Sequence, residues 1–215
     1  MRIVCISDTH GRHKKIKDIP EGDVLIHAGD ITPSGQLDML GSFNKWLGKL
    51  PHPNKIIVAG NHDWCFTKEY RLIAKEMVTN ATYLEDSEII IDGVKFYGSP
   101  WQPEFCNWAF NLPRGEELAE IWSHIPDDTN VLITHAPPYG LLDLVINERS
   151  NENGEQVGCI DLGERIFALK KLKLHVFGHI HCAHGEIYKD GIHYVNASTC
   201  TEAYMADNEP IVVDI

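Results

Sequence analysis

The chain has 215 residues, of which 43% are hydrophobic and 23% charged, and its formal net charge is -12. This is the composition of an ordinary globular protein, and the length predicts one domain over residues 1–215. The negative charge argues against general nucleic-acid binding, because basic patches supply most of that affinity. Six scattered cysteines, no signal peptide and no apolar stretch long enough for a bilayer predict a cytoplasmic protein without membrane spans.

Strands and helices are expected to alternate over the first third of the chain. Apolar runs predict strands at 3–7, 24–28 and 55–59. Apolar residues at helical spacing predict a helix over 36–47, and a second helix is expected over 67–77 with Thr67 as its N-cap. This order is typical of layered α/β domains.

The rest of the chain adds antiparallel pairs to this pattern. Two Asp-Gly turns predict β-hairpins over 87–98 and 186–195. Further strands are expected at 131–134, 174–177 and 211–213. Helices are expected over 115–123 and 161–172. We therefore predict an α/β fold with four layers, an α/β/β/α sandwich in which helices flank two mixed sheets.

Five of the predicted strands run directly into residues of types that bind metals. They end at Asp8-Thr9-His10, Gly29-Asp30, Gly60-Asn61-His62-Asp63, Thr134-His135 and Gly178-His179-Ile180-His181. Open α/β sheets place ligands at the carboxyl ends of their strands, so these ends are expected to converge. One such match would be ordinary turn chemistry, whereas five predict a polynuclear metal site.

The strand ends supply seven oxygen or nitrogen ligands and no thiolate, namely Asp8, His10, Asp30, Asn61, His135, His179 and His181. A structural zinc ion needs only four ligands, usually with cysteine among them, so two divalent ions are implied, and the ligand types suit Mn, Fe or Zn. Asp30 is the natural bridge between the ions. Such a pair would hold a hydroxide and neutralise a phosphate oxygen, which predicts in-line hydrolysis of a phosphate ester.

Proton transfer to the departing alkoxide is expected from His62, beside Asn61. Asp63 either orients the His62 ring or caps the following helix, and the cap is slightly favoured. His27 and His175 lie within predicted strands and are expected to be core or edge residues. The aromatic loop 99–108 either packs on itself at the surface or forms a wall of the active site. No substrate-binding residue is assigned.

The five motifs, in this order, resemble the calcineurin-like metallophosphoesterase superfamily. Further segments are similar to its metallophosphoesterase-domain-containing branch, namely Gly98-Ser99-Pro100-Trp101, Asn111-Leu112-Pro113-Arg114-Gly115, His135-Ala136-Pro137-Pro138-Tyr139-Gly140, Lys173-Leu174-His175-Val176-Phe177-Gly178 and Asn196-Ala197-Ser198-Thr199-Cys200. The resemblance implies a phosphodiesterase that acts on cyclic nucleotides or other small phosphodiesters.

The resemblance also implies how the ligands divide. One metal would be held by Asp8, His10, Asp30 and His181, and the other by Asp30, Asn61, His135 and His179, with His62 near the leaving group. The superfamily often carries another acidic residue shortly after its Gly-Asp, where this chain has Ile31-Thr32-Pro33-Ser34, so the partner of His62 stays open.

Two other functions remain open at this level. A phosphomonoesterase, including a protein phosphatase, uses the same metal core. A non-catalytic scaffold keeps the fold for protein binding, although degenerate ligands are its usual sign and none of the seven is missing. The sequence leaves the physiological substrate, the metal pair and the oligomeric state undetermined.

Overall fold

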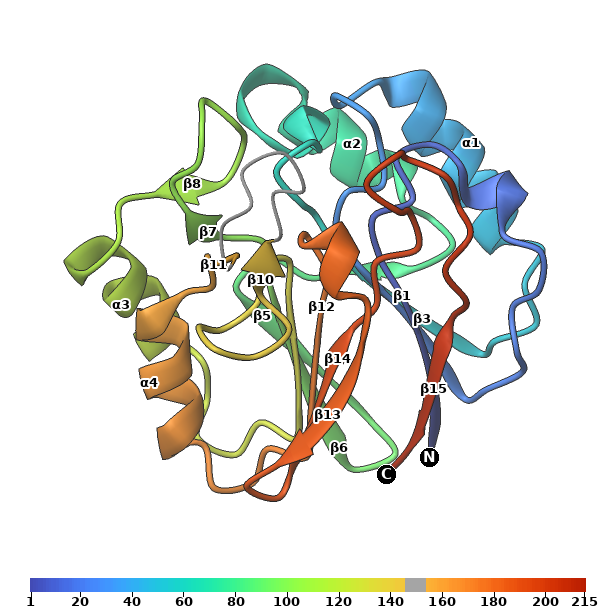
Figure 1. Ribbon diagram of the computed structural model, residues 1–215. Coiled ribbons are helices and arrows are strands. Elements are labelled where there is room, and N and C mark those ends of the chain that lie inside the picture. The colour runs from blue at the N-terminus through green and yellow to red at the C-terminus, as the bar shows by residue number, and fades with distance from the viewer. Residues whose placement is uncertain (146–153) are drawn as a thin grey trace.

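A computed structural model, which describes residues 1–145 and 154–215, contains two main β-sheets with helices on their outer faces (Figure 1). The five-stranded sheet has the order β15-β1-β2-β3-β4. Its strands are β1 (Arg2–Ile6), β2 (Val24–Ala28), β3 (Asn54–Val58), β4 (Thr82–Tyr83) and β15 (Ile211–Asp214). Strands β1 to β4 are parallel, and β15 pairs antiparallel with β1 at the edge.

The six-stranded sheet has the order β13-β14-β12-β9-β6-β5. Its strands are β5 (Ser87–Ile91), β6 (Val94–Ser99), β9 (Val131–Thr134), β12 (Leu174–Phe177), β13 (Gly185–Lys189) and β14 (Ile192–Asn196). The two predicted hairpins form its antiparallel edges, β5–β6 and β13–β14, around a parallel centre. Two short ladders that the sequence did not indicate join β7 (Gln102–Pro103) to β8 (Asn111–Leu112) and β10 (Leu144–Val145) to β11 (Glu155–Gln156).

Two pairs of α-helices form the outer layers: α1 (Leu37–Leu47) and α2 (Arg71–Met77) on one side, and α3 (Glu116–Ser123) and α4 (Ile160–Ala168) on the other. Short 3-10 turns lie at η1 (His13–Lys15), η2 (Trp64–Phe66), η3 (Lys68–Tyr70) and η4 (His181–Ala183). The prediction that Thr67 caps α2 is wrong. Its hydroxyl donates to the carbonyl of Trp64, and the α-helix begins only at Arg71.

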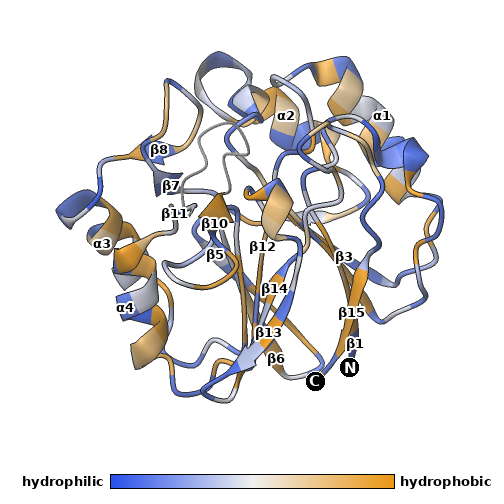
Figure 2. Cartoon of the chain, in the orientation of Figure 1, coloured by the Kyte–Doolittle hydropathy of each residue, from blue (hydrophilic) through white to orange (hydrophobic). Residues whose placement is uncertain are grey.

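Side-chain alternation along the strands builds three apolar interiors. Ile3 of β1 packs with Ile133 of β9 between the two sheets, whereas Val4 faces α1 and α2 and Leu132 faces α3 and α4. The strands are accordingly coloured mainly as hydrophobic in Figure 2, and many of the connecting loops as hydrophilic. The predicted α/β/β/α sandwich is therefore confirmed, and its parallel strands bring their carboxyl ends to one end of the molecule.

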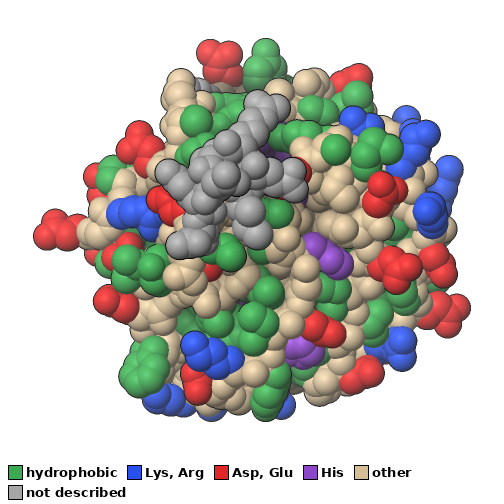
Figure 3. Space-filling model, viewed as in Figure 1, with side chains coloured by type: hydrophobic (Ala, Val, Ile, Leu, Met, Phe, Trp, Pro, Cys, Tyr) green, Lys and Arg blue, Asp and Glu red, His purple; other side chains and the backbone are tan. Residues whose placement is uncertain are grey.

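The outer surface mixes charges of both signs. On the face shown in Figure 3, acidic side chains are scattered, while many of the basic ones lie toward its edges. None of the helices in the described part of the chain is long and apolar enough to span a bilayer.

Two buried histidines in the strands are expected to make the free energy of unfolding depend on pH. His27 and His175 are fully buried, and burial lowers the pKa of each to about 3. The unfolded chain, with histidine pKa values near 6.5, therefore binds more protons than the folded one between these pH values. We expect the free energy of unfolding to fall below about pH 6.5, with each histidine contributing up to about 1.4 kcal/mol per pH unit.

Urea unfolding of the metal-free protein at a series of pH values between 7.5 and 5 measures this slope. The variant His175→Gln should show a shallower slope, because one buried group no longer titrates. An unchanged slope in this variant would show that His175 is protonated in the folded state. As predicted, both histidines lie in the core.

Candidate metal centre

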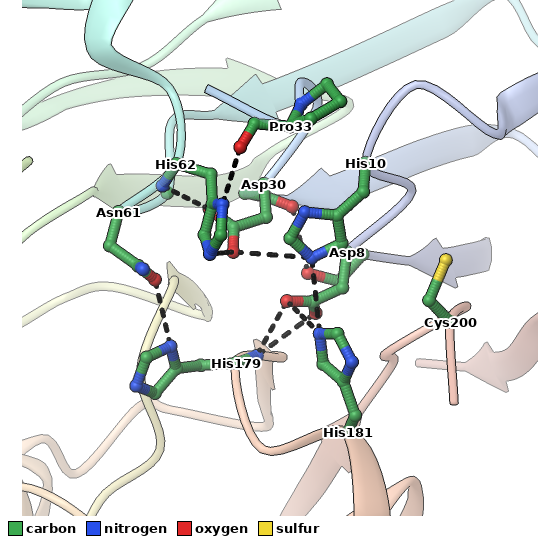
Figure 4. Close-up of polar contacts among 12 residues, drawn as sticks. Asp8, His10, Asp30, Pro33, Asn61, His62, His179, His181 and Cys200 are labelled. Carbon is green, nitrogen blue, oxygen red and sulfur yellow. Dashed lines mark hydrogen bonds and ion pairs between the residues drawn. The ribbon is translucent and has the colours of Figure 1, made fainter. Parts of the chain in front are cut away.

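The seven predicted ligand residues lie together at the carboxyl ends of five strands. Figure 4 labels all of them except His135. The first three strands supply Asp8 and His10 after β1, Asp30 after β2, and Asn61 after β3; the second sheet supplies His135 after β9 and His179 and His181 after β12. Five of them are at most 5% exposed, and His179 and His181 are partly buried. Side chains from both sheets thus face one region between the strand ends.

One group of donor atoms surrounds the tip of His181. Its Nε2 lies 3.4 Å from Asp8 Oδ1 and 3.3 Å from His10 Nε2. His10 Nε2 in turn lies 3.6 Å from Asp30 Oδ2. Asp8, His10 and His181 bring one ligand atom each to within 4.8 Å of one another.

A second group lies on the other side of Asp30. His135 Nε2 is 2.8 Å from Asn61 Oδ1 and 3.4 Å from Asp30 Oδ2. His179 Nδ1 approaches the same Asn61 oxygen at 3.0 Å. Asp30 Oδ2 therefore borders both groups, which is the arrangement expected of a bridging carboxylate.

Four of the seven residues have a left-handed backbone. The φ angles of Asp8, His10, Asp30 and His179 are 50°, 43°, 57° and 68°. Such values are uncommon outside glycine, and backbone strain of this kind gathers at functional sites. Hydrogen bonds between the loops, from Asp8 N to the carbonyl of Gly29 and from His10 N to that of Asp30, both 2.9 Å long, hold this conformation.

The hydrogen bonds that the Nδ1 atoms of His135 and His181 make indicate whether the site suits a cation. His135 Nδ1 lies 3.0 Å from the carbonyl of Ala28, and His181 Nδ1 lies 3.1 Å from that of Thr201. A carbonyl only accepts, so both rings carry a proton on Nδ1, and a neutral ring points the Nε2 lone pair at the oxygens of Asn61 or Asp8. Lone pairs facing oxygen acceptors need a proton or a cation between them, so these residues fit a metal ion.

Two rings are held neutral by their surroundings. Burial, the largest effect, lowers the pKa of His10 to about 4 and that of His179 to about 3. Burial alone would raise the pKa of Asp8, yet the neighbouring His181 ring keeps it well below its usual range. Neutral imidazoles beside an ionised carboxylate are in the protonation states that metal binding requires.

His135 behaves differently. Burial would lower its pKa, but the charge and hydrogen bond of Asp30 outweigh this and raise it to about 9. The ring therefore holds a proton between itself and the carboxylate. A divalent cation in the same position would displace that proton.

Three motif glycines allow the strand ends to approach so closely. A Cβ atom on Gly178 would overlap Asp8 Oδ2, one on Gly60 would overlap Asp30 Oδ1, and one on Gly29 would overlap the His135 ring. Each glycine thus leaves room for a ligand residue from a different motif. This explains why the Gly-Asp, Gly-Asn and Gly-His pairs carry glycine at these positions.

The variant Gly178→Ala is expected to displace the Asp8 carboxylate and to lower metal content and turnover together. Gly163→Ala in α4 is the matched control, since a Cβ atom there meets nothing within 4 Å. It should bind metal normally and be stabilised by up to about 1 kcal/mol. Elemental analysis of both variants measures the effect, and a wild-type metal content in Gly178→Ala would contradict it.

His62 lies at the edge of the site, with its ring held on several sides. Its Nδ1 lies 2.7 Å from the carbonyl of Pro33, its face stacks on Trp108 at a centroid distance of 4.2 Å, and its Nε2 points toward Asp30 Oδ2 at 4.0 Å. The backbone carbonyl of Pro33 thus stands where the resemblance implied an acidic side chain. This contact supplies the partner of His62 that the sequence left open.

Neither interpretation of Asp63 is right. Its buried carboxylate accepts hydrogen bonds from the backbone N–H groups of Gly60, Ile31 and Thr32 and from the Thr32 hydroxyl. It makes no side-chain cap on η2. Burial, and then the charge of Asp30, raise its pKa to about 6. Asp63 joins the loop that carries Asp30 to the loop that carries Asn61.

Two residues that contact the candidate ligands, Ser198 and Tyr204, were not predicted from the sequence. Ser198 donates its hydroxyl to Asp8 Oδ2 at 2.9 Å, and it follows β14, so the strand-end argument applied to that strand would have found it. Tyr204 places its ring edge-on against those of His10 and His181 at 4.9 and 5.4 Å. Tyr204 lies in a long loop, and no sequence pattern there predicts that its ring contacts the site.

Four of the seven candidate ligand residues line a cavity of about 310 Å³, namely Asp30, Asn61, His179 and His181. Phe105 and Trp108 of the aromatic loop line it, so part of this loop borders the site. The other described lining residues are His62, Val145, Ile180, Cys182, Glu202 and Tyr204.

Comparisons with known proteins place the chain among metallophosphoesterases. A family model described as Calcineurin-like phosphoesterase matches residues 1–183. Metallophosphoesterase domain-containing protein 1 of Homo sapiens is 43% identical over 236 residues, an alignment that covers 100% of this chain and 71% of the human protein. The Mus musculus protein of the same name matches equally. One solved structure with 18% sequence identity has a TM-score of 0.68 and covers 91% of this chain and 89% of its own, a likeness of fold alone.

Proposed function

This chain belongs to the calcineurin-like phosphoesterase family, and from that premise we propose that it is a dinuclear metal-dependent phosphodiesterase. The main support for two ions is the position of Asp30, whose Oδ2 lies 3.6 Å from His10 Nε2 and 3.4 Å from His135 Nε2. One carboxylate between two groups of nitrogen and oxygen donors supports a pair of ions rather than a single one.

The proposal assigns the two ligand sets as follows: one ion to Asp8, His10, Asp30 and His181, and the other to Asp30, Asn61, His135 and His179. When bound, two such ions would lower the pKa of a water molecule, the nucleophile for in-line attack on phosphorus, and would neutralise the charge of the phosphate oxygens.

His62 is the proposed general acid. Its Nδ1 donates to the carbonyl of Pro33 at 2.7 Å, which leaves Nε2 directed toward Asp30. A proton on Nε2 passes to the departing alkoxide oxygen, which would otherwise leave as a strong base. The carbonyl of Pro33 and the stacked ring of Trp108 fix the direction of this transfer.

The charges around the cavity support a diester over a monoester. Within the described residues that line it, there is no Lys or Arg, and Glu202 adds a carboxylate. A monoester dianion carries more charge than a diester monoanion and would rely on basic side chains that these residues do not provide.

We further propose that the substrate is a cyclic nucleotide or another small phosphodiester, that the ions are Mn, Fe or Zn, and that the protein is cytoplasmic. The ligand types support the metals. Free thiols support a reducing compartment, and they are found at Cys5, Cys65, Cys106, Cys159 and Cys200.

Hydrolysis of bis-p-nitrophenyl phosphate, p-nitrophenyl phosphate and a set of cyclic nucleotides, with Mn added and metal content measured on the same sample, tests the proposal. We expect about two ions per chain and a kcat/KM for the diesters at least about tenfold above that for the monoester. A preference for the monoester would overturn the substrate class. Metal content well below one ion per chain, with no hydrolysis, would favour a non-catalytic scaffold.

A further inference from the structure

An exposed aromatic side chain stands at the mouth of the metal-site cavity. Phe105 is 61% exposed and lines this cavity together with Trp108. A single exposed phenylalanine needs no explanation. Two aromatic side chains from one loop form part of the wall of a cavity that Asp30, Asn61 and His179 also line, and they suggest a surface for a flat ligand.

The loop that carries Phe105 is held firmly. The side-chain amide of Asn111 donates to the carbonyls of Phe105 and Cys106 at 3.1 and 3.0 Å. Gln102, which is fully buried, donates to the Asn111 side-chain oxygen at 2.8 Å. The backbone of this wall is therefore held in place without a ligand, which lowers the entropic cost of binding.

Contacts between aromatic rings show that Trp108 lies next to His62, the proposed general acid. Trp108 stacks on His62 with 28° between the rings, His62 meets His10 edge-on at 4.7 Å, and His10 meets Tyr204 edge-on at 4.9 Å. Trp108 thus contacts His62 of the histidine pair, whereas Tyr204 contacts His10. Trp108 is therefore the ring beside the proposed general acid.

We propose that Phe105 and Trp108 form a subsite for a planar aromatic ring, such as a nucleobase, carried by the leaving group of the diester. The inference rests on the proposed function, because His62 marks the side on which the leaving group departs. One face of Trp108 is covered by His62, so the ring stacks on Phe105 and contacts the part of Trp108 that lines the cavity. A neutral ring also suits a wall on which the described residues place no cation.

Calorimetric titration of the manganese-loaded protein with adenosine and with methyl riboside tests the subsite without turnover. We expect adenosine to bind about tenfold more tightly, the effect of one base–aromatic stack. Phe105→Ala should abolish the difference and Phe105→Trp should restore it. Phe167→Ala is the matched control, since Phe167 is 82% exposed on α4 and does not line the cavity. Equal affinities in wild type and Phe105→Ala would overturn the proposal.

Kinetics with matched substrates identify the ring. Adenosine 2′,3′-cyclic phosphate is compared with the same cyclic phosphate of methyl riboside, and benzyl methyl phosphate with cyclohexylmethyl methyl phosphate. A Phe105-dependent preference in the first pair alone identifies a nucleobase subsite, and one in both pairs identifies a general aromatic subsite.

The two measurements separate this inference from the proposed function. Phe105-dependent binding of adenosine by a protein that hydrolyses no diester would leave the ring subsite standing and overturn the phosphodiesterase. Hydrolysis with equal kcat/KM in both members of each pair would overturn the subsite and leave the phosphodiesterase.

Discussion

Asp30→Ala is expected to release both metal ions and to lower kcat/KM for a phosphodiester by about a thousandfold or more. The Asp30 carboxylate lies between the two donor groups, within 3.6 Å of His10 Nε2 and 3.4 Å of His135 Nε2, so both groups lose a ligand at once. Elemental analysis after gel filtration and initial rates with added Mn measure the two effects.

Asp18→Ala controls for the loss of a carboxylate, because Asp18 is exposed and lies outside the site. It should retain both ions and full activity. Metal loss in Asp30→Ala could also follow from unfolding, so circular dichroism must show that the variant keeps its fold. A folded Asp30→Ala protein that retained two tightly bound ions would rule out the bridging role.

His62→Ala is expected to retain both ions and to lose turnover, by about 10²–10⁴-fold for an alkyl leaving group. The ring lies beside the metal residues but belongs to neither proposed ligand set. Its loss removes the proton donor and leaves the donor atoms of Asp8, Asp30 and Asn61 in place. Metal content and kcat, measured on the same preparation, separate these effects.

The leaving group provides an internal control for this variant. A p-nitrophenolate departs without a proton, so its release should suffer far less from His62→Ala than that of an alkoxide such as a ribose oxygen. The matched variant His124→Ala, whose side chain is 57% exposed, should change neither rate. Equal losses for both leaving groups would show that His62 acts by charge or position rather than as an acid.

The convergence of the seven candidate ligand residues could be predicted because the strand-end argument is local. A buried parallel strand is recognisable as a short apolar run, and the residues just after it must lie at one edge of the sheet. Asp30 and Asn61 follow neighbouring parallel strands, so their proximity followed from the pattern. The approach of His135 to Asp30 requires in addition that the second sheet face the first, which the hairpins and the alternating order indicated.

Contacts that depend on loops could not be predicted in this way. Asp63 looked like a helix cap because acidic residues are common there, but its carboxylate instead binds N–H groups of the Asp30 loop at 2.8 and 3.0 Å. The backbone carbonyl of Pro33 accepts the hydrogen bond of His62 Nδ1. Because every residue has a backbone carbonyl, the sequence does not indicate which one makes this contact. Tyr204 reaches His10 only through the path of the C-terminal loop.

Local patterns were therefore sufficient for the four layers and for the residues that follow the strands, since burial and strand direction act over a few residues at a time. The packing of the two sheets decided the rest: which nitrogen faces which oxygen, which carbonyl holds His62, and which aromatic side chains border the cavity. These depend on contacts between segments far apart in the chain, such as Ser198 with Asp8, and their distances follow from the whole fold rather than from any one stretch.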